Sequence, residues 1–508
     1  MTRRRVVVES FIVAVVIVAV VALMISGVAG RAVERGLYAT GLWVPVTGET
    51  TVAPSRFAEP EVSTPTPSFD ESPVAPVAPT AAAPDASRVR AAIAGIGRDK
   101  IGGTFHVSVV DLGSGTKLYS ENGGAPAAPA STMKVLTSVA ALQQYGVEHR
   151  FTTKVMLEPT PAGPTTPDSA SPSPSAAPSP SASPATPAPQ QPPTIVLVGG
   201  GDPYLNTGTL KDSYPAPTIG TLAESTAKAL QARGITTVRL KYDDSLFTGP
   251  AWNPTWPSNY ADQVTPVSAL TVNQGRVDGS SPGERVADPS ATAAAVFVQR
   301  LKAHGITVSG APARGAAPDG SDEVATLESL PLGEIVEHLM RVSDNDAAEI
   351  LMRHTAIARG KPGSFEGGRA AIAETMTELG AWSGSMVVHD GSGLSRDTRI
   401  TTDALAILMR LVTTDEPRYR PVMTGMPVGG VDGSLRLRYV VDGTTAGRGQ
   451  VRAKTGTLRQ VHSLAGYVRS ADGSLIGFAM VSIGAKDEYA ARTWLEKASA
   501  AMASCGCG

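Results

Sequence analysis

A serine and a lysine stand three positions apart in the stretch Ser131-Thr132-Met133-Lys134, where an apolar repeat of helical period begins. The repeat continues to Gly146, so we expect a helix that begins near Ser131 and ends at that glycine. Lys134 should then lie on the same helix face as Ser131. A partly desolvated lysine can take the proton of a serine hydroxyl and turn it into a nucleophile. A serine that only caps the helix, beside a surface lysine, would show the same residues, so other motifs must decide whether the pair is catalytic.

The composition limits the number of domains, the binding partners and the disulfides that this chain can have. A chain of 508 residues is long enough for two or more domains. Its 44 basic and 46 acidic residues nearly cancel, and no basic run follows Arg3–Arg5, which argues against nucleic-acid binding. Cys505 and Cys507 are the only cysteines, so a disulfide framework in the core is excluded. A redox or metal role for the pair is conceivable, but a frayed C-terminus at 504–508 is the expectation.

The N-terminal region predicts a membrane anchor and a tether. Three arginines precede an apolar run, Phe11–Ala29, that is long enough to cross a bilayer as one helix. The arginines predict that the N-terminus stays in the cytoplasm while the rest is exported. We therefore expect residues 1–30 to be an uncleaved single-pass anchor, with a cleaved signal peptide as the alternative. Residues 31–86 are rich in Pro and Ala and predict a disordered tether.

The middle of the chain predicts an inserted lobe. Strands are expected at Thr104–Leu112, Thr116–Ser120 and Phe151–Leu157, around the helix of Ser131. The tract 159–193 contains almost only Pro, Ser, Ala and Thr, and predicts a disordered loop. Between 153 and 329 strand-like and helix-like segments alternate, which indicates an α/β lobe separate from 87–152. Its expected elements are strands at Thr194–Val198, Val238–Tyr242 and Ile306–Ser309, and helices at Ile219–Gly234 and Pro289–His304.

From residue 330 to 503 the pattern changes again. Two predicted helices, Leu332–Val342 and Asp346–Arg359, flank the short motif Ser343-Asp344-Asn345. A predicted strand carries Lys454-Thr455-Gly456-Thr457. The other expected elements are a glycine-rich loop at His389–Leu394, a helix at Thr402–Leu411, a hairpin of Val461–Arg469 with Leu475–Ile483, and a helix at Glu488–Met502.

Three short motifs therefore follow one another in helix, loop and strand contexts, a combination that chance rarely produces. The set occurs in β-lactamases and penicillin-binding proteins. Its chemistry is acyl transfer: Ser131 would attack an amide carbonyl, and Lys134 would accept the serine proton. Ser343 and Asn345 would relay protons and bind the substrate backbone.

The third motif would bind the substrate. Lys454 would supply a positive field that attracts a carboxylate and lowers the pKa of Lys134 by repulsion. Thr455 and Thr457 would bind the carboxylate, and Gly456 would leave room for the substrate along the strand edge. The backbone N–H of Ser131 and one from residues 454–457 would hold the oxyanion.

On these motifs the chain resembles the low-molecular-mass class C penicillin-binding proteins, which are serine-type D-alanyl-D-alanine carboxypeptidases and endopeptidases. The resemblance covers residues from about 88 to 503 and includes Gly199–Pro203, Asp243–Phe247 and Asp390–Ser395. The long separation of Ser131 from Ser343 fits, because the family inserts extra domains between its first two motifs. A third lobe that some members carry is reduced to a few residues after Val277, and the Pro/Ser tract is additional.

The resemblance implies a fold and a function. The fold would be α+β, with helices on a five-stranded antiparallel sheet built from 87–152 and 330–503, and with the inserted α/β lobe. The substrate would be the peptidoglycan stem peptide, β-lactam antibiotics would be inhibitors, and neither a metal nor an organic cofactor would be needed.

Several alternatives remain open. A β-lactamase uses the same motifs, although small β-lactamases place the second much closer to the first. A catalytically idle cell-wall binding protein would keep the fold. The run Gly279–Gly283 fits the Gly-x-Ser-x-Gly pattern of α/β-hydrolases, but no strand precedes it, so a turn is expected. The seven histidines are scattered, which disfavours a metal hydrolase; His389 and His462 could edge the cleft.

Overall fold

The computed structural model describes residues 83–98, 100–159, 191–209, 214–413 and 417–508. The predicted anchor at 1–30, almost all of the tether and most of the Pro/Ser tract lie outside these ranges. Within the described ranges no helix is both long enough and apolar enough to cross a membrane.

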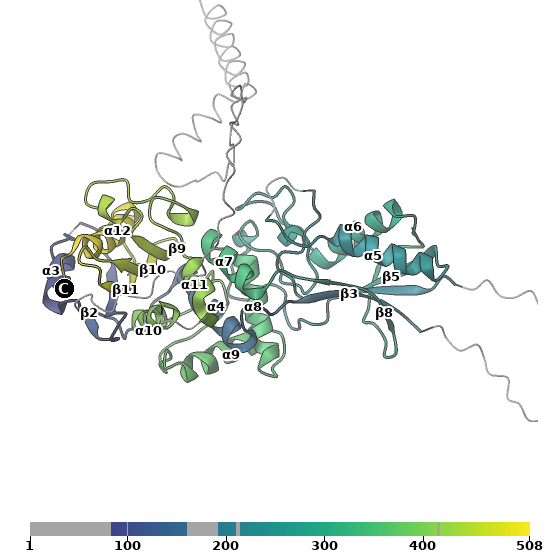
Figure 1. The fold of residues 1–508 in the computed structure, drawn as a ribbon, viewed down its shortest axis with the longest axis horizontal. Helices are drawn as coiled ribbons and strands as arrows, with labels where there is room; N and C mark the ends of the chain where they lie inside the picture. The colour runs from purple at the N-terminus through teal and green to yellow at the C-terminus, as the bar shows by residue number, and fades with distance from the viewer. Residues whose placement is uncertain (1–82, 99, 160–190, 210–213, 414–416) are drawn as a thin grey trace, which may run out of the picture. The chain divides into compact units, whose positions relative to one another are not determined.

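The first sheet has five antiparallel strands, as the resemblance implied, and joins the two ends of the described chain (Figure 1). Its central strand β11 (Leu475–Ile483) is an almost continuous apolar run that is buried on both faces. The sheet order is β2 (Lys117–Glu121), β1 (Thr104–Asp111), β11, β10 (Val461–Arg469) and β9 (Val451–Leu458). Strand β9 is therefore an edge strand, and one of its sides remains available to a site.

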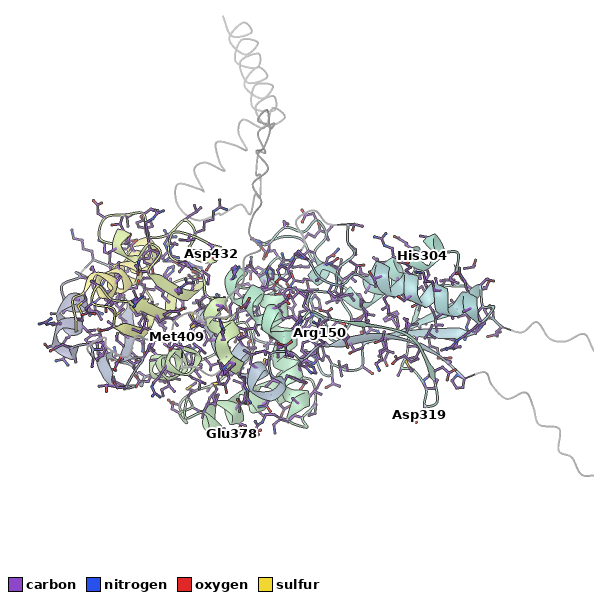
Figure 2. All side chains as sticks on the ribbon, viewed as in Figure 1. Arg150, His304, Asp319, Glu378, Met409 and Asp432 are labelled. Atoms are coloured by element: carbon purple, nitrogen blue, oxygen red, sulfur yellow. A yellow bond between two sulfur atoms is a disulfide. The ribbon has the colours of Figure 1, made fainter. Side chains whose placement is uncertain are left out.

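Helices cover both faces of this sheet, which is the layered solution for a sheet buried on both sides. On one face, Trp494 of α12 (Glu488–Ser504) packs against Phe105 with ring centroids 4.7 Å apart. On the other face lies α10 (Thr402–Thr413), whose buried Met409 belongs to the same core cluster as Ala479 of β11. Met409 lies inside the molecule in Figure 2, whereas Glu378 lies at its rim. The helix α3 (Ala86–Ala94) joins α12 on its face.

A group of helices extends the second face around α4 (Met133–Tyr145), and its members bear the first two motifs. One member, α9 (Phe365–Glu378), was not predicted, because Gly367 and Gly368 interrupt its pattern. These glycines allow close packing: a Cβ at Gly367 would lie 2.1 Å from the carbonyl oxygen of Pro362. The remaining helices of the group are α7 (Leu332–Val342), α8 (Asn345–Ala358) and α11 (Arg420–Thr424).

A second sheet is built from strands between residues 152 and 328, almost the same range as the lobe predicted at 153–329. Its order is β6 (Thr307–Val308), β5 (Thr237–Asp243), β4 (Thr194–Val198), β3 (Thr152–Leu157) and β8 (Asp322–Glu328), while β7 (Ala313–Arg314) also pairs with β5. The two helices α5 (Ile219–Ala232) and α6 (Pro289–Ala303) bury their apolar sides in its core. Strand β8 was not predicted, because it is an edge strand in which only Ala325 is buried. Below, residues 153–329 are called the inserted segment.

The C-terminal tail is ordered, so the expectation of a frayed end was wrong. Cys505 and Cys507 form a disulfide with each other. The carbonyl oxygen of Cys507 accepts a hydrogen bond from the N–H of Asp85, the cap of α3. Arg88 donates to the carbonyl oxygen of Gly506 at 2.8 Å. These partners lie at the other end of the chain, where the sequence pattern gives no sign of them.

Candidate active site

The three motifs meet at one place, at the start of α4, the junction of α7 with α8, and the edge of β9. The Nζ of Lys134 donates to the Oγ of Ser131 at 3.0 Å and to the Oδ1 of Asn345 at 2.7 Å. The Nζ of Lys454 donates to the Oγ of Ser343 at 2.7 Å. All five residues proposed from the sequence as catalytic are therefore linked in two hydrogen-bonded sets.

Ser131 lies in a short 3₁₀ turn, η1 (Ala130–Thr132), immediately before α4, rather than in the first α-helical turn as expected. Its side chain is half-buried. The preceding Ala130 has a φ of 47°, which is unusual for a residue with a Cβ. Gly393 packs against this turn, because a Cβ there would lie 1.9 Å from the carbonyl oxygen of Ala130. The turn fixes the direction in which the serine hydroxyl faces.

Lys134 is fully buried and has a third acceptor, the carbonyl oxygen of Ser392 at 2.7 Å. Burial lowers the pKa of Lys134 to about 8, although the nearby carboxylates of Glu349 and Asp390 act in the opposite direction. Burial, and not the expected repulsion from Lys454, is thus the main cause of the low pKa. Burial also lowers the pKa of Lys454, with repulsion by Lys134 as a second cause.

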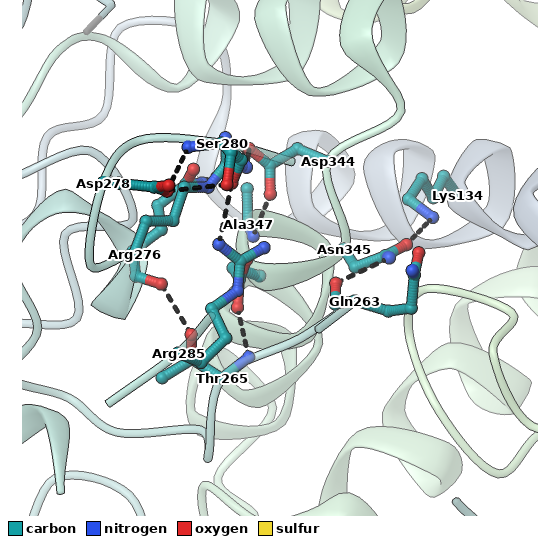
Figure 3. Close-up of polar contacts among 12 residues, drawn as sticks. Lys134, Gln263, Thr265, Arg276, Asp278, Ser280, Arg285, Asp344, Asn345 and Ala347 are labelled. Carbon is teal, nitrogen blue, oxygen red and sulfur yellow. Dashed lines mark hydrogen bonds and ion pairs between the residues drawn. The ribbon is translucent and has the colours of Figure 1, made fainter. Parts of the chain in front are cut away.

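The second motif is both a helix junction and part of the site. Ser343 ends α7 in the left-handed conformation, with φ 62° and ψ 45°. Asp344 caps α8, because its side chain accepts from the N–H of Ala347 at 3.1 Å. Asn345 is the first residue of α8 and turns its side chain toward Lys134 (Figure 3). The left-handed serine costs roughly 1–3 kcal/mol of backbone strain, which the surrounding contacts have to offset.

The third motif lies on the edge strand β9. Lys454 is fully buried and also donates to the carbonyl oxygen of Thr455 at 2.8 Å. The Thr455 hydroxyl contacts that of Ser434 at 2.7 Å, a neighbour that no sequence motif indicated, in η5 (Gly433–Leu435). Gly456 also packs against the serine turn: a Cβ there would lie 2.9 Å from the backbone nitrogen of Ser131. Glycine therefore lets the strand approach the serine turn. Thr457 is exposed.

The edge of β9 offers a second backbone donor. The N–H of Ala453 bonds to the carbonyl oxygen of Pro427, away from the partner strand β10. Backbone N–H groups alternate in direction along an antiparallel strand, so those of Thr455 and Thr457 point to the same open side. The N–H of Thr457 thus points to the open edge of β9, one residue after Gly456, which packs against the serine turn.

Glu349 and Ser392 build the surroundings of Lys134, and sequence reasoning missed their roles. Glu349 lies one turn after Asn345 on α8 and is fully buried. Its carboxylate accepts the N–H groups of Gly391 at 3.0 Å and Ser392 at 2.7 Å. These bonds hold the glycine-rich loop so that the carbonyl oxygen of Ser392 faces Lys134. The loop itself was predicted from the sequence, but no role in the site was assigned to it, and Glu349 belongs to no motif.

The remaining candidates take no part in this arrangement. His462 is buried against Glu488 at 3.3 Å, and His389 is half-buried at the start of the glycine-rich loop. Gly279–Gly283 is a turn without a preceding strand, as expected. Among the described residues, no group of three or more His, Cys, Asp or Glu side chains is arranged to hold a metal ion.

Fold and site together define a penicillin-binding or β-lactamase-like protein with a serine and a lysine at the start of one helix. The chain belongs to the D-Ala-D-Ala carboxypeptidase 3 (S13) family, whose pattern matches residues 90–168, 185–281 and 276–504. It is thus a low-molecular-mass class C penicillin-binding protein, as its motifs indicated.

Individual relatives agree with this assignment. The carboxypeptidase DacB of Mycolicibacterium smegmatis is 29% identical over 499 residues, which cover 97% of this chain and 96% of the relative. The D-alanyl-D-alanine carboxypeptidase of an Actinomadura species is 27% identical, over 75% of this chain and 78% of its own. Penicillin-binding protein 4 of Haemophilus influenzae has the same fold, with a TM-score of 0.62 at 20% identity, over 80% of this chain and 97% of its own.

Proposed function

We propose that this protein is a serine-type D-alanyl-D-alanine carboxypeptidase that trims peptidoglycan stem peptides through an acyl-enzyme on Ser131. The observation that supports the proposal most directly is the fully buried Lys134, whose Nζ lies 3.0 Å from the Ser131 hydroxyl. A lysine with a pKa of about 8 is neutral often enough near neutral pH to act as a base.

The acylation step follows from this geometry. The Oγ of Ser131 attacks the carbonyl carbon of the penultimate D-Ala while its proton moves to the neutral Nζ of Lys134. The backbone N–H groups of Ser131 and Thr457 stabilise the oxyanion. The C–N bond then breaks, and the leaving D-Ala amine takes up the proton that Lys134 received, relayed by Ser343, which is bonded to Lys454. Water later attacks the ester carbonyl and gives a proton to the again neutral Lys134; the C–O bond breaks, and Lys134 returns this proton to Ser131.

Recognition of the terminal carboxylate would fall to the third motif. The carboxylate would lie near Lys454 and accept from the hydroxyls of Thr455 and Thr457. An arriving anion favours the charged form of Lys454, whose pKa burial holds well below its usual range. A β-lactam carries a carboxylate and an acylating amide in a similar arrangement, so it would acylate Ser131 as well. Penicillin-binding protein 4 of Haemophilus influenzae has been solved in complex with a β-lactam.

The location and organisation of the chain belong to the same proposal. The apolar run Phe11–Ala29 would anchor it as a single-pass protein with the N-terminus in the cytoplasm, and residues 31–86 would tether the enzyme outside. The catalytic domain would consist of 87–152 and 330–503, with 153–329 as the inserted lobe. A cross-linked stem peptide offers the same acyl group, so DD-endopeptidase activity would use the same serine.

Two measurements test the proposal. A fluorescent penicillin should label the wild-type protein covalently, and should not label Ser131→Ala that melts at the same temperature. A stem pentapeptide should lose one D-Ala on incubation with the wild-type protein, and a cross-linked dimer reports the endopeptidase activity. Equal labelling of both proteins would refute the role of Ser131, and drug release within seconds would favour a β-lactamase.

A further inference from the structure

A strained turn in the inserted segment lies directly behind the second motif. Asn273, Gln274 and Gly275 form η3 with φ values of 52°, 55° and 64°. Two of these residues carry a Cβ, so the left-handed run is unfavourable on its own. It is held in place, since the Thr265 hydroxyl donates to the carbonyl oxygen of Gln274 at 2.6 Å and the side chain of Asn273 accepts from the N–H of Thr207 at 2.9 Å.

This turn aims the side chain of Gln274 at the motif. Its Nε2 donates to the Oδ2 of Asp344 at 2.5 Å, and both residues are buried. The other oxygen of Asp344 caps α8 through the N–H of Ala347. Gln274 thus fixes the rotation of the carboxylate that starts α8.

The same segment contacts the next two residues of the motif region (Figure 3). The carbonyl oxygen of Gln263 accepts from the Nδ2 of Asn345 at 3.0 Å, which orients the Oδ1 of that amide toward Lys134. The N–H of Thr265 donates to the Oδ1 of Asp346 at 2.7 Å. Residues 344, 345 and 346 are therefore each bonded to the inserted segment.

Two arginines of the segment balance the buried carboxylates. Arg285 lies 3.6 Å from Asp346, and the two side chains are only 3% and 6% exposed. Arg276 lies 3.8 Å from Asp344. Two carboxylates buried at one helix start repel each other, so without these cations the start of α8 would have to shift or take up a proton.

We propose that Gln274 and Arg285 are positioning residues for acylation of Ser131. They hold Asp344 and Asp346, and through them place Ser343 and Asn345 against Lys454 and Lys134. The inference rests on the proposed acyl-transfer function and adds to it a role for the inserted segment: the segment completes the support of the proton-transfer groups. Because a misplacement of about 1 Å can cost about 100-fold in rate, loss of this support should slow acylation strongly.

The test compares variants of the full chain in their reaction with a fluorescent penicillin. Gln274→Asn suits the left-handed backbone but is one methylene too short to reach Asp344. Arg285→Met removes the charge, and Arg285→Lys retains it. Arg314→Met is the matched control, because Arg314 is also in the inserted segment and pairs with Asp244 at 2.9 Å and Asp288 at 3.1 Å, away from the motif.

The readouts are the first-order acylation rate constant, the dissociation constant of the non-covalent complex, and the melting temperature. We expect Gln274→Asn and Arg285→Met to slow acylation about 10- to 100-fold with a dissociation constant within about threefold of wild type. Arg285→Lys should recover part of the rate, and Arg314→Met should leave it unchanged.

The inference is overturned if folded Arg285→Met acylates within about threefold of wild type, if Arg314→Met slows acylation equally, or if only the dissociation constant changes. If Arg285→Met does not fold, the acylation rate of Gln274→Asn alone tests the inference, since this substitution leaves every charge in place. A failure of the proposed function is different, because wild type would then not label or Ser131→Ala would label.

Discussion

The pH dependence of acylation tests the proposed base most directly. Burial lowers the pKa of Lys134 from 10.5 to about 8. With a pKa of about 8, roughly 9% of Lys134 is neutral at pH 7 and roughly 91% at pH 9. An exposed lysine would be only ~0.03% neutral at pH 7, so burial supplies about 300-fold more base, or about 3 kcal/mol. Acylation should therefore rise about tenfold from pH 7 to pH 9 with an apparent pKa near 8.

The assay is the second-order rate constant for labelling by a fluorescent penicillin whose carboxylate is its only ionisable group. Two variants identify the titrating residue. Lys134→Arg keeps a positive charge that does not dissociate, so it should lose at least about 100-fold and show no rise with pH. Burial and the neighbouring Asp390 also raise the pKa of Glu349 to about 8, so Glu349→Gln is needed as a second control.

Glu349→Gln should keep the rise between pH 7 and pH 9, even where its absolute rate differs. The reasoning is refuted if the wild-type rate is flat across this range, or if Lys134→Arg retains the rise. If the rise disappears in Glu349→Gln while Lys134 is intact, the titrating group is the carboxyl and not the lysine.

Three other substitutions probe features around and away from the site. Gly456→Ala places a Cβ 2.2 Å from the hydroxyl of Ser463, so it should destabilise the folded protein by about 1–3 kcal/mol in thermal melting and slow penicillin labelling at least tenfold. Unchanged melting and labelling would contradict the close approach of β9 to the serine turn. Cys505→Ser removes the disulfide with Cys507, which closes a very short loop, so it should lower the free energy of unfolding by only about 1–2 kcal/mol and leave the labelling rate unaltered. Phe297→Ala empties a fully buried position in the core of the second sheet and should cost about 3–5 kcal/mol in denaturant unfolding, whereas a loss below about 1 kcal/mol would show that this core is not closely packed.

The helices and strands with a strong period could be predicted from the sequence, because periodicity reports which side of an element is buried. Strand β4 and helix α7 have the predicted bounds, as do both strands of the β10–β11 hairpin. Elements with weak periodicity were missed: glycines interrupt α9, and β8 buries a single apolar residue.

The sequence by itself determined the candidate nucleophile, the candidate base and the strand that carries Lys454, because three short motifs in fixed order contain them. The tertiary structure decided that the three motifs meet at one place, since strands before residue 122 pair with strands after residue 450. The proton affinity of Lys134 is also decided only by the fold, because it depends on the burial of this lysine and on its contact with the carbonyl oxygen of Ser392. Glu349 holds the loop that carries Ser392, about forty residues further along the chain. The same is true of Gln274 and Arg285, whose partners Asp344 and Asp346 stand about sixty to seventy residues further along the chain. Local sequence patterns predict burial and turns, but electrostatic interactions between residues far apart in the sequence exist only once the chain has folded.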